Sequence, residues 1–346
     1  MMKRAILLTL VMIVTIMMVP PVMAADLKAI KLIHSGNDPA HIGGNVYLRE
    51  KWLPKINSEI AKFGYKFDVT FYHSESLYKY ADQVQALEDG LIDFTTFVVS
   101  WEKARAPLHT LISSPFMGFN AQSAQRIWFE LQETIPEFGA EFSKYKEIWH
   151  MTMIPAVLNA NKAVRVPADF KGKKVMSTGM RADLFKSIGA VPLRLGPPDW
   201  YTSLERGLLD VMPLGIYSVL VFKLTEVTNT HIFFTGDSLG YTGMTYIMNR
   251  KKYESLPPAV QKVIDDNVKP CSTEQTGIDE ENRIMAEKKI KEMGHNVIYL
   301  TPEEMELWYD AAKPIHEEWI KEMEGKGLPG RKVFNEAKRL AKKYAE

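Results

Sequence analysis

Cysteine is almost absent from this chain of 346 residues, which contains only Cys271. A single cysteine cannot form a disulfide within the chain, so the fold has to be stabilised by its hydrophobic core. The chain also lacks an excess of either charge, since 43 Lys and Arg residues face 42 Asp and Glu residues. This balance does not favour nucleic acid or an anionic membrane surface as a partner.

Sequence patterns of common enzymes are missing as well. The chain has no G-x-x-x-x-G-K-[ST] loop, no G-x-G-x-x-G after a strand and no G-x-S-x-G elbow. The segment that begins at His316 starts like a zinc-binding helix, but Ile320 stands where the second histidine would be. The other histidines do not have the spacing of metal ligands. We therefore expect no enzyme activity, no cofactor and no metal site.

The only long uncharged run lies at the N-terminus. Lys3 and Arg4 precede an apolar stretch over 5–19, prolines end it, and Ala24 and Ala25 offer small residues for cleavage. The run is shorter than the roughly 18 residues that span a bilayer. No cysteine near these alanines provides a lipoprotein anchor. The pattern predicts a signal peptide cleaved near Ala24 or Ala25, and hence a freely diffusing exported protein.

The mature chain, 26–346, is longer than a single core usually supports, which indicates two lobes with a cleft between them. Short apolar runs alternate with amphipathic stretches in a β-α-β-α-β order, which is typical of an α/β lobe with a parallel sheet. The first such unit has strands over 29–34, 67–72 and 93–98 and helices over 44–61 and 80–89. The second has strands over 174–177, 191–195 and from 209, and helices over 181–188 and 198–206.

Two segments, 86–93 and 203–210, repeat the same order of a helix end, a glycine and a buried strand. Any helix-glycine-strand junction can give this pattern, so the repeat favours similarly built lobes without establishing them. Ligands in open α/β sheets bind beyond the carboxyl ends of the strands. This rule directs attention to 97–101 in one lobe and 213–217 in the other.

The last third of the chain is predicted to be helical. A charged stretch over 273–293 has a partial apolar stripe, and the order Thr301, Pro302, Glu304 is typical of a helix start. Apolar residues then recur at helical spacing up to Trp319. Such a stripe indicates a packed core rather than a cofactor site.

The stretch 169–214 resembles a known family. Ten residues keep that family's pattern: Asp169, Phe170, Lys171, Gly172, Lys174, Gly189, Pro192, Leu204, Gly207 and Asp210. The stretch is similar to the second-lobe core of the DctP-type solute-binding proteins that serve tripartite ATP-independent periplasmic (TRAP) transporters. A phrase over 248–257 adds to the resemblance.

The resemblance implies a two-lobed periplasmic binding protein with mixed α/β sheets, crossing hinge strands and bracing C-terminal helices. The hinge strands are expected near 149–158 and 234–241. Such a clamshell captures a small organic solute between its lobes and delivers it to TRAP membrane permease subunits without ATP hydrolysis. We assign the signal peptide to 1–25, lobe I to 26–150 and 238–278, and lobe II to 151–237 and 279–346.

One departure bears on the ligand. Where the family usually has an arginine that pairs with a substrate carboxylate, this chain has Met176, which offers only an apolar contact. Pro213 and Leu214 likewise replace the acid and tryptophan of a cation-dependent subgroup. We expect an atypical ligand, neutral or weakly polar where it faces Met176, with any acid group directed toward lobe I or Arg181. Alternatively, Arg181 or Arg105 has taken over the anchoring role for an ordinary small carboxylate.

Strand ends, aromatic residues and the resemblance together nominate nine ligand-binding residues: His34, Phe97, Trp101, Asn159, Met176, Arg181, Leu214, Tyr217 and Tyr241. A lone histidine such as His34 is more often structural, and Trp101 and Tyr217 could pack between the lobes instead. Arg181 could equally be a solvated surface charge.

Two other classes stay open. A binding protein of an ATP-driven importer would share export and a clamshell fold. An exported enzyme could use a pair of cleft carboxylates, such as Glu102 with Asp82 or Asp199.

We expect the exported protein to begin at Ala25 or Asp26 when its N-terminus is sequenced. Ile13→Arg places a charge in the apolar stretch and should leave the precursor uncleaved, because the signal peptide then loses its hydrophobic segment. A mature, exported protein that still begins at Met1 would contradict the assignment.

Overall fold

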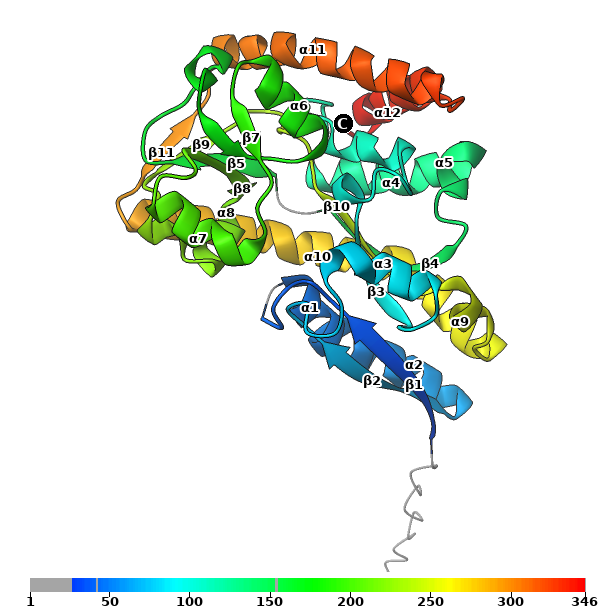
Figure 1. Ribbon diagram of the computed structural model, residues 1–346. Coiled ribbons are helices and arrows are strands. Elements are labelled where there is room, and N and C mark those ends of the chain that lie inside the picture. Colours follow the sequence, from blue (N-terminus) through cyan, green and yellow to red (C-terminus); the bar gives the residue numbers. More distant parts are fainter. Residues whose placement is uncertain (1–26, 42, 153–154, 346) are drawn as a thin grey trace, which may run out of the picture.

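The computed structural model describes residues 27–41, 43–152 and 155–345, which form two β-sheets flanked by helices (Figure 1). The predicted signal peptide lies outside these residues. Within the described ranges, no helix combines the length and apolar character needed to cross a membrane.

The first sheet, sheet A, has the strand order β2-β1-β3-β10-β4. Its strands are β1 (Lys28–Ser35), β2 (Tyr65–Tyr72), β3 (Phe94–Val98), β4 (Tyr145–Thr152) and β10 (Gly243–Asn249). β1 pairs in parallel with β2 and β3, whereas β10 runs antiparallel to β3 and β4. The connecting helices are α1 (Gly43–Tyr47), a π-helical turn (Leu48–Trp52), α2 (Leu53–Ile60) and α3 (Tyr80–Glu88).

The second sheet, sheet B, has the order β11-β9-β5-β8-β6-β7. Its strands are β5 (Ala156–Ala160), β6 (Lys174–Met176), β7 (Val191–Leu193), β8 (Val211–Gly215), β9 (Thr230–Phe233) and β11 (Asn296–Tyr299). β6 is parallel to β7 and β8, and β5 is antiparallel to β8 and β9. The helices α6 (Gly179–Ser187), α7 (Pro197–Glu205) and α8 (Ile216–Val221) connect them.

The two sheets share one topology, as the repeated sequence segments indicate. The order β2-β1-β3-β10-β4 in sheet A corresponds to β7-β6-β8-β5-β9 in sheet B, with the same parallel and antiparallel pairings. The repeated glycines, Gly90 and Gly207, both adopt left-handed backbone conformations with φ of +74° and +68°. Each ends a helix and leads the chain into the next strand.

The chain crosses from sheet A to sheet B between β4 and β5, and returns between β9 and β10. The prediction of a hinge strand over 234–241 is wrong, because β9 ends at Phe233 and β10 begins at Gly243. Gly236 and Gly240 in this return segment have φ of +75° and +86°. A strand needs negative φ throughout, so these glycines break the extended backbone.

Helix α10 (Pro258–Glu292) spans 35 residues and runs alongside both sheets (Figure 1). The sequence predicted a helix only over 273–293, whereas α10 begins at Pro258 and continues through Pro270, a residue that usually ends or kinks a helix. Near its start, α10 buries Val260 and Ile264 in the core of sheet A. Near its end it buries Ala286 and Ile290 against sheet B.

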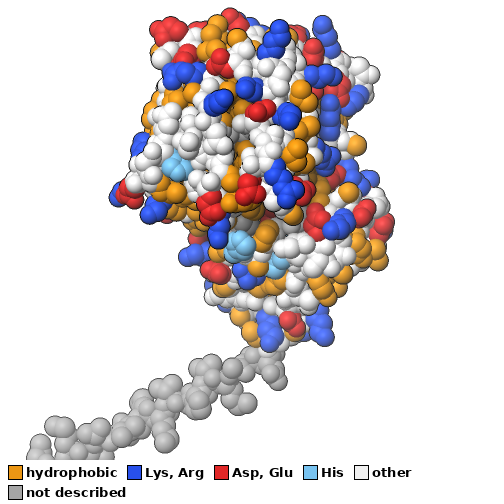
Figure 2. Space-filling model, turned by 60° about the vertical axis from the view of Figure 1, so that its left-hand side comes forward, with side chains coloured by type: hydrophobic (Ala, Val, Ile, Leu, Met, Phe, Trp, Pro, Cys, Tyr) orange, Lys and Arg blue, Asp and Glu red, His pale blue; other side chains and the backbone are white. Residues whose placement is uncertain are grey.

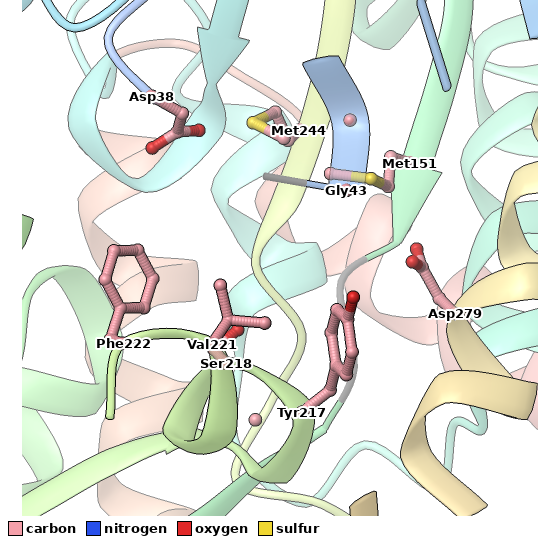
Figure 3. Close-up of a pocket in the computed structure, with 11 residues that line it drawn as sticks. Asp38, Gly43, Met151, Tyr217, Ser218, Val221, Phe222, Met244 and Asp279 are labelled. Atoms are coloured by element: carbon pink, nitrogen blue, oxygen red, sulfur yellow. The ribbon is translucent and has the colours of Figure 1, made fainter. Parts of the chain in front are cut away.

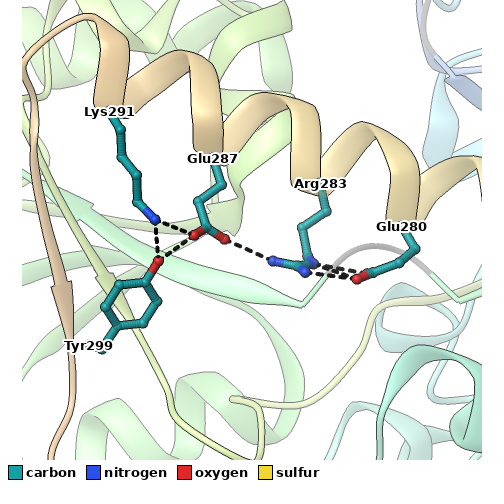
Figure 4. A network of polar contacts seen from close by, with 5 residues as sticks. All are labelled: Glu280, Arg283, Glu287, Lys291 and Tyr299. Carbon is teal, nitrogen blue, oxygen red and sulfur yellow. Dashed lines mark hydrogen bonds and ion pairs between the residues drawn. The ribbon is translucent and has the colours of Figure 1, made fainter.

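A row of charged side chains fixes the end of α10 to β11 (Figure 4). Arg283 donates to Glu280 at 2.8 Å and to Glu287 at 3.0 Å. Lys291 donates to Glu287 at 2.7 Å and to the hydroxyl of Tyr299 at 2.8 Å, and that hydroxyl also donates to Glu287. These side chains are partly exposed, so each pair contributes at most about 1 kcal/mol.

Helix α11 (Pro302–Gly325) begins as predicted. The hydroxyl of Thr301 accepts from the backbone N–H of Glu304, whose carboxylate accepts from the N–H of Thr301, and this capping box starts the helix. Trp308 and Trp319 are buried, as the apolar stripe predicts. α11 packs on α6, and α12 (Gly330–Ala345) packs on α4 (Ala121–Thr134). Two short helices, α5 (Pro136–Ala140) and α9 (Arg250–Glu254), complete the α-helices of the described residues.

We predict that Gly240→Ala strongly destabilises the protein. A Cβ at this position would collide with the carbonyl oxygen of Ser113 and lie 2.8 Å from its carbonyl carbon, in addition to the strain of positive φ. Gly236 is a matched control in the same segment, since it also has positive φ but a Cβ there would meet no atom within 4 Å. Gly236→Ala should cost about 1 kcal/mol, and Gly240→Ala about 3 kcal/mol or more. Urea denaturation measures the unfolding free energy of both variants. Equal losses in the two variants would contradict the predicted collision at position 240.

Candidate functional site

The carboxyl ends of the strands of both sheets face a common cleft. Asn37 and Asp38 follow β1, Trp101 follows β3, and Ser177 follows β6. Three cavities lie here, and neighbouring cavities share lining residues, so they adjoin one another along the cleft. The position agrees with the rule that ligands in α/β sheets bind beyond the strand ends. The face in Figure 2 shows positive and negative side chains intermixed, in keeping with the balanced charge.

The central cavity receives side chains from both sheets. From the sheet A side come Asn37, Asp38, Val98, Ser100, Trp101 and Met244, and from the sheet B side come Met176, Ser177, Thr178, Arg181, Trp200, Pro213 and Leu214. Four residues singled out from the sequence, Trp101, Met176, Arg181 and Leu214, therefore line the same cavity. Tyr217 lines the cavity next to it.

Arg181 is the one described cation on the wall of the central cavity. It lies in the first turn of α6, and its Nη2 donates to the hydroxyl of Thr242 at 2.9 Å. Its Nε is buried without a hydrogen-bond partner, and no ion pair joins it to any described carboxylate. Burial lowers the pKa of Arg181 to about 10. The guanidinium therefore retains donors for an anion that the protein itself does not supply.

Arg105, the other arginine considered as an anchor for a ligand carboxylate, already has its charge paired with carboxylates of the protein. Its guanidinium donates to Glu102 at 2.8 Å and lies 3.3 Å from Glu88. The same pairs raise the pKa of Arg105 above its usual value, although burial opposes them. Arg105 is not among the residues that line the three cavities.

The rest of the central cavity is mainly apolar. Met176 and Leu214 pack against a small hydrophobic cluster that contains Trp200. The indole N–H of Trp200 donates to the carbonyl oxygen of Leu195 at 3.0 Å. On the opposite side, Trp101 stands edge-on to Tyr80, with ring centroids 4.4 Å apart. The cavity thus combines one cationic donor group with apolar and aromatic walls.

The second cavity contains two carboxyl groups, from Asp38 and Asp279, together with Tyr217 (Figure 3). Burial raises the pKa of Asp38 to about 6, with a smaller contribution from the charge of Glu75. Burial also raises the pKa of Asp279 to about 7, although a hydrogen bond from Gln275 opposes the shift. Sequence reasoning missed both aspartates. The position of Asp38 just beyond β1 could have indicated a binding residue. Asp279 lies within a long helix, and its sequence surroundings do not indicate one.

Four of the nominated residues do not line the three cavities. His34 is fully buried with its ring near Phe71, Phe94 and Tyr246, and burial lowers its pKa to about 3, assisted by His73. His34 is the penultimate residue of β1, so its side chain enters the packed face of the sheet rather than the space beyond the strand end.

The other three have structural contacts. Phe97 is buried in the core. Asn159 donates to the carbonyl oxygens of Met212 at 2.7 Å and Val157 at 3.0 Å, which braces β5 against β8. The hydroxyl of Tyr241 donates to the carbonyl of Phe119 at 3.1 Å.

The three carboxylates considered for an enzyme from the sequence do not gather in the cleft. Glu102 is paired with Arg105 and does not line the cavities, whereas Asp199 lies at the cleft mouth and Asp82 is exposed on α3. Among the described residues, no three His, Cys, Asp or Glu side chains gather in a way that could hold a metal ion.

Comparison with known proteins agrees with this architecture. Residues 53–322 match the model of the family "Bacterial extracellular solute-binding protein, family 7". The chain is 25% identical over 309 residues to the C4-dicarboxylate-binding periplasmic protein DctP of Vibrio cholerae, covering 85% of this chain and 87% of that protein.

Solved structures show the same fold. A TRAP solute-binding protein from a marine metagenome, specific for aromatic acid ligands, is similar with a TM-score of 0.84 and 23% identity over 92% of this chain and 100% of that one. A TRAP solute-binding protein from Rhodoferax ferrireducens, in complex with copurified benzoate, is similar with a TM-score of 0.82 and 20% identity over 91% of this chain and 98% of that one.

The matched region covers most of the chain. The chain belongs to bacterial extracellular solute-binding protein family 7 and is a solute-binding protein of the TRAP type.

Proposed function

We propose that the exported, periplasmic protein binds a small organic acid in its interlobe cleft, with the carboxylate held by Arg181, and delivers it to TRAP membrane permease subunits. The observation that carries this proposal is the guanidinium of Arg181, which lies in the central cavity without a carboxylate partner. A buried cation of this kind opposes folding unless an anion accompanies it. A ligand carboxylate would supply that anion and accept two parallel hydrogen bonds.

The body of the ligand would lie against apolar side chains. Met176 and Leu214 offer aliphatic contact from one side, and Trp101 offers an aromatic surface from the other. This favours an acid with an aromatic or aliphatic body over a small polar dicarboxylate. Two of the similar structures hold metahydroxyphenylacetate and benzoate, which supports the same ligand chemistry for this chain.

Ligand capture would close the cleft. We assign Trp101 to lobe I, 26–150 with 238–278, and Arg181 to lobe II, 151–237 with 279–346. A ligand that contacts both side chains binds the closed form better than the open one and shifts the population toward it. The bond from Arg181 to Thr242 already links α6 to the segment where the chain returns to sheet A.

This function does not include catalysis. Glu102 is committed to Arg105, which leaves the alternative of a carboxylate-pair enzyme without its central residue. Family membership likewise supports a TRAP permease over an ATP-driven importer as the partner. Incubation with candidate acids followed by chromatography tests the enzyme alternative, since a carrier returns every solute unchanged.

We predict that Arg181→Met weakens binding of benzoate and phenylacetate about 30-fold or more, because removal of one partner of a buried charge pair costs roughly 2–5 kcal/mol. Titration calorimetry of ligand-free protein measures the effect. Arg206→Met is the matched control, since Arg206 is exposed at the end of α7 in the same lobe. Equal affinity of wild type and Arg181→Met would refute the anchor.

A second prediction concerns stability without ligand. The lowered pKa of Arg181 means that folding disfavours its charged form, so at neutral pH the guanidinium destabilises the empty protein. Arg181→Met should therefore raise the unfolding free energy of the ligand-free protein by about 1–3 kcal/mol. Thermal melts with and without acid measure this: the variant should melt higher when empty and gain nothing from ligand. A lower melting temperature would indicate a structural role instead.

A further inference from the structure

The first turn of α6 lies on the wall of the central cavity. Ser177 and Thr178, which precede this helix, and Arg181, in its first turn, all line that cavity. Ser177 and Arg181 are each two residues from Gly179, which puts both of their Cα atoms within about 7 Å of the Cα of Gly179. Hydrogen-bond donors of this short segment are therefore close enough to meet at one carboxylate.

Three backbone N–H groups at the start of α6 have no partner in the part of the chain that the structure describes. They belong to Gly179, Met180 and Arg181, and none of them donates to a described carbonyl or side chain. Thr178 precedes the helix, yet its side chain does not cap it. Met180 is buried. Since a buried N–H group without a partner is rare, this end of the helix requires water or a ligand as acceptor.

The backbone at Gly179 directs these N–H groups toward a common point. Gly179 has a left-handed conformation with φ of +58°, and the helix that follows is right-handed. A left-handed residue next to right-handed ones brings successive N–H groups together into a concave site that binds anions. The N-terminus of a helix also carries a partial positive charge. This turn therefore favours a negatively charged acceptor over a neutral one.

Two side chains add donors to the same turn. Ser177 is 7% exposed, and its hydroxyl is buried without a hydrogen-bond partner among the described residues. The Nε of Arg181 is buried in the same state, and no described carboxylate pairs with its guanidinium. Water would satisfy these donors but would not neutralise the charge of Arg181, whereas a carboxylate does both.

We propose that the first turn of α6 binds the ligand carboxylate through its backbone, together with the hydroxyl of Ser177 and the guanidinium of Arg181. The proposal rests on the proposed function, because it assumes that an organic acid is held at Arg181. It adds the N–H groups of Gly179, Met180 and Arg181 as donors, and it makes Ser177 a residue that determines affinity for the acid. The carboxylate site is then built by a helix turn beyond Met176 and does not need an arginine at that position.

The same turn contacts the segment that follows β3 in sheet A. A Cβ atom at Gly179 would lie 3.5 Å from the Cβ of Ser100, which is ordinary van der Waals contact. Ser100 precedes Trp101, and both line the central cavity. An acid whose carboxylate lies at this turn therefore has Trp101 nearby as an apolar surface for its body, which agrees with an aromatic or aliphatic acid.

Nuclear magnetic resonance of protein labelled with ¹⁵N at methionine tests the backbone donors. Met180→Leu and Met305→Leu identify the amide signals of the two residues by their disappearance. Met305 is the internal control, because it lies in the first turn of α11 and its N–H already donates to the carbonyl oxygen of Thr301 at 2.9 Å. Saturation with benzoate or phenylacetate should move the amide proton of Met180 downfield, since a hydrogen bond to an anion deshields the proton, and should leave Met305 in place.

Calorimetric titration of Ser177→Ala tests the side-chain donor. The affinity for both acids should fall about tenfold, because a hydrogen bond to a charged group is lost. Ser58→Ala is the matched control, since Ser58 is exposed on α2, and its affinity should equal that of wild type. Ligand-free Ser177→Ala should melt no lower than wild type, because the hydroxyl of Ser177 has no described partner to lose.

Two results would overturn the proposal while the proposed function stands. In the first, the acids bind and Arg181→Met weakens their binding, but the signal of Met180 moves no further than that of Met305. In the second, Ser177→Ala binds the acids as tightly as wild type, or melts at a lower temperature without ligand. If neither benzoate nor phenylacetate binds wild type, this proposal and the proposed function both fail.

Discussion

Charged side chains that lack ion-pair partners in the cleft are the constraint on which this account depends. The cleft contains the guanidinium of Arg181 and the carboxyl groups of Asp38 and Asp279, and none of them forms an ion pair with a described residue. The pKa values of all three groups are shifted toward the neutral form, and burial is the largest cause of each shift. Arg105, in contrast, is paired with Glu102. An external molecule that supplies the opposite charge in the cleft would therefore stabilise the protein.

The fold explains why these groups meet. Two sheets of the same topology direct the carboxyl ends of their parallel strands toward one cleft, and the chain passes between them from β4 to β5, from β9 to β10 and through α10 to β11. Segments beyond those strand ends contribute Asp38 and Trp101 from one sheet and Ser177 from the other. Helix α10, which runs along both sheets, adds Asp279 from outside either sheet. A change in the angle between the sheets would thus alter the distances among all these side chains.

Much of this architecture could be predicted from sequence, because strands, glycine junctions and the capping box at Thr301 are set by local chemistry. The prediction failed where context overrides a local rule. Pro270 lies inside α10 although proline usually ends a helix, and the return segment 234–241 is a loop because its glycines adopt positive φ. The direction of His34 depends on the pleat of its strand, and the approach of Asp279 to the cleft depends on the packing of a whole helix. Neither can be read from neighbouring residues.

Mass spectrometry of small molecules released by denaturing the purified protein tests the central claim most directly. If Arg181 anchors a carboxylate in the cleft, wild-type protein should release an organic acid in an amount comparable to that of the protein, and Arg181→Met purified in parallel should release little of it. Release of the same compound in equal amounts from both proteins, or of a neutral compound alone, would contradict the account.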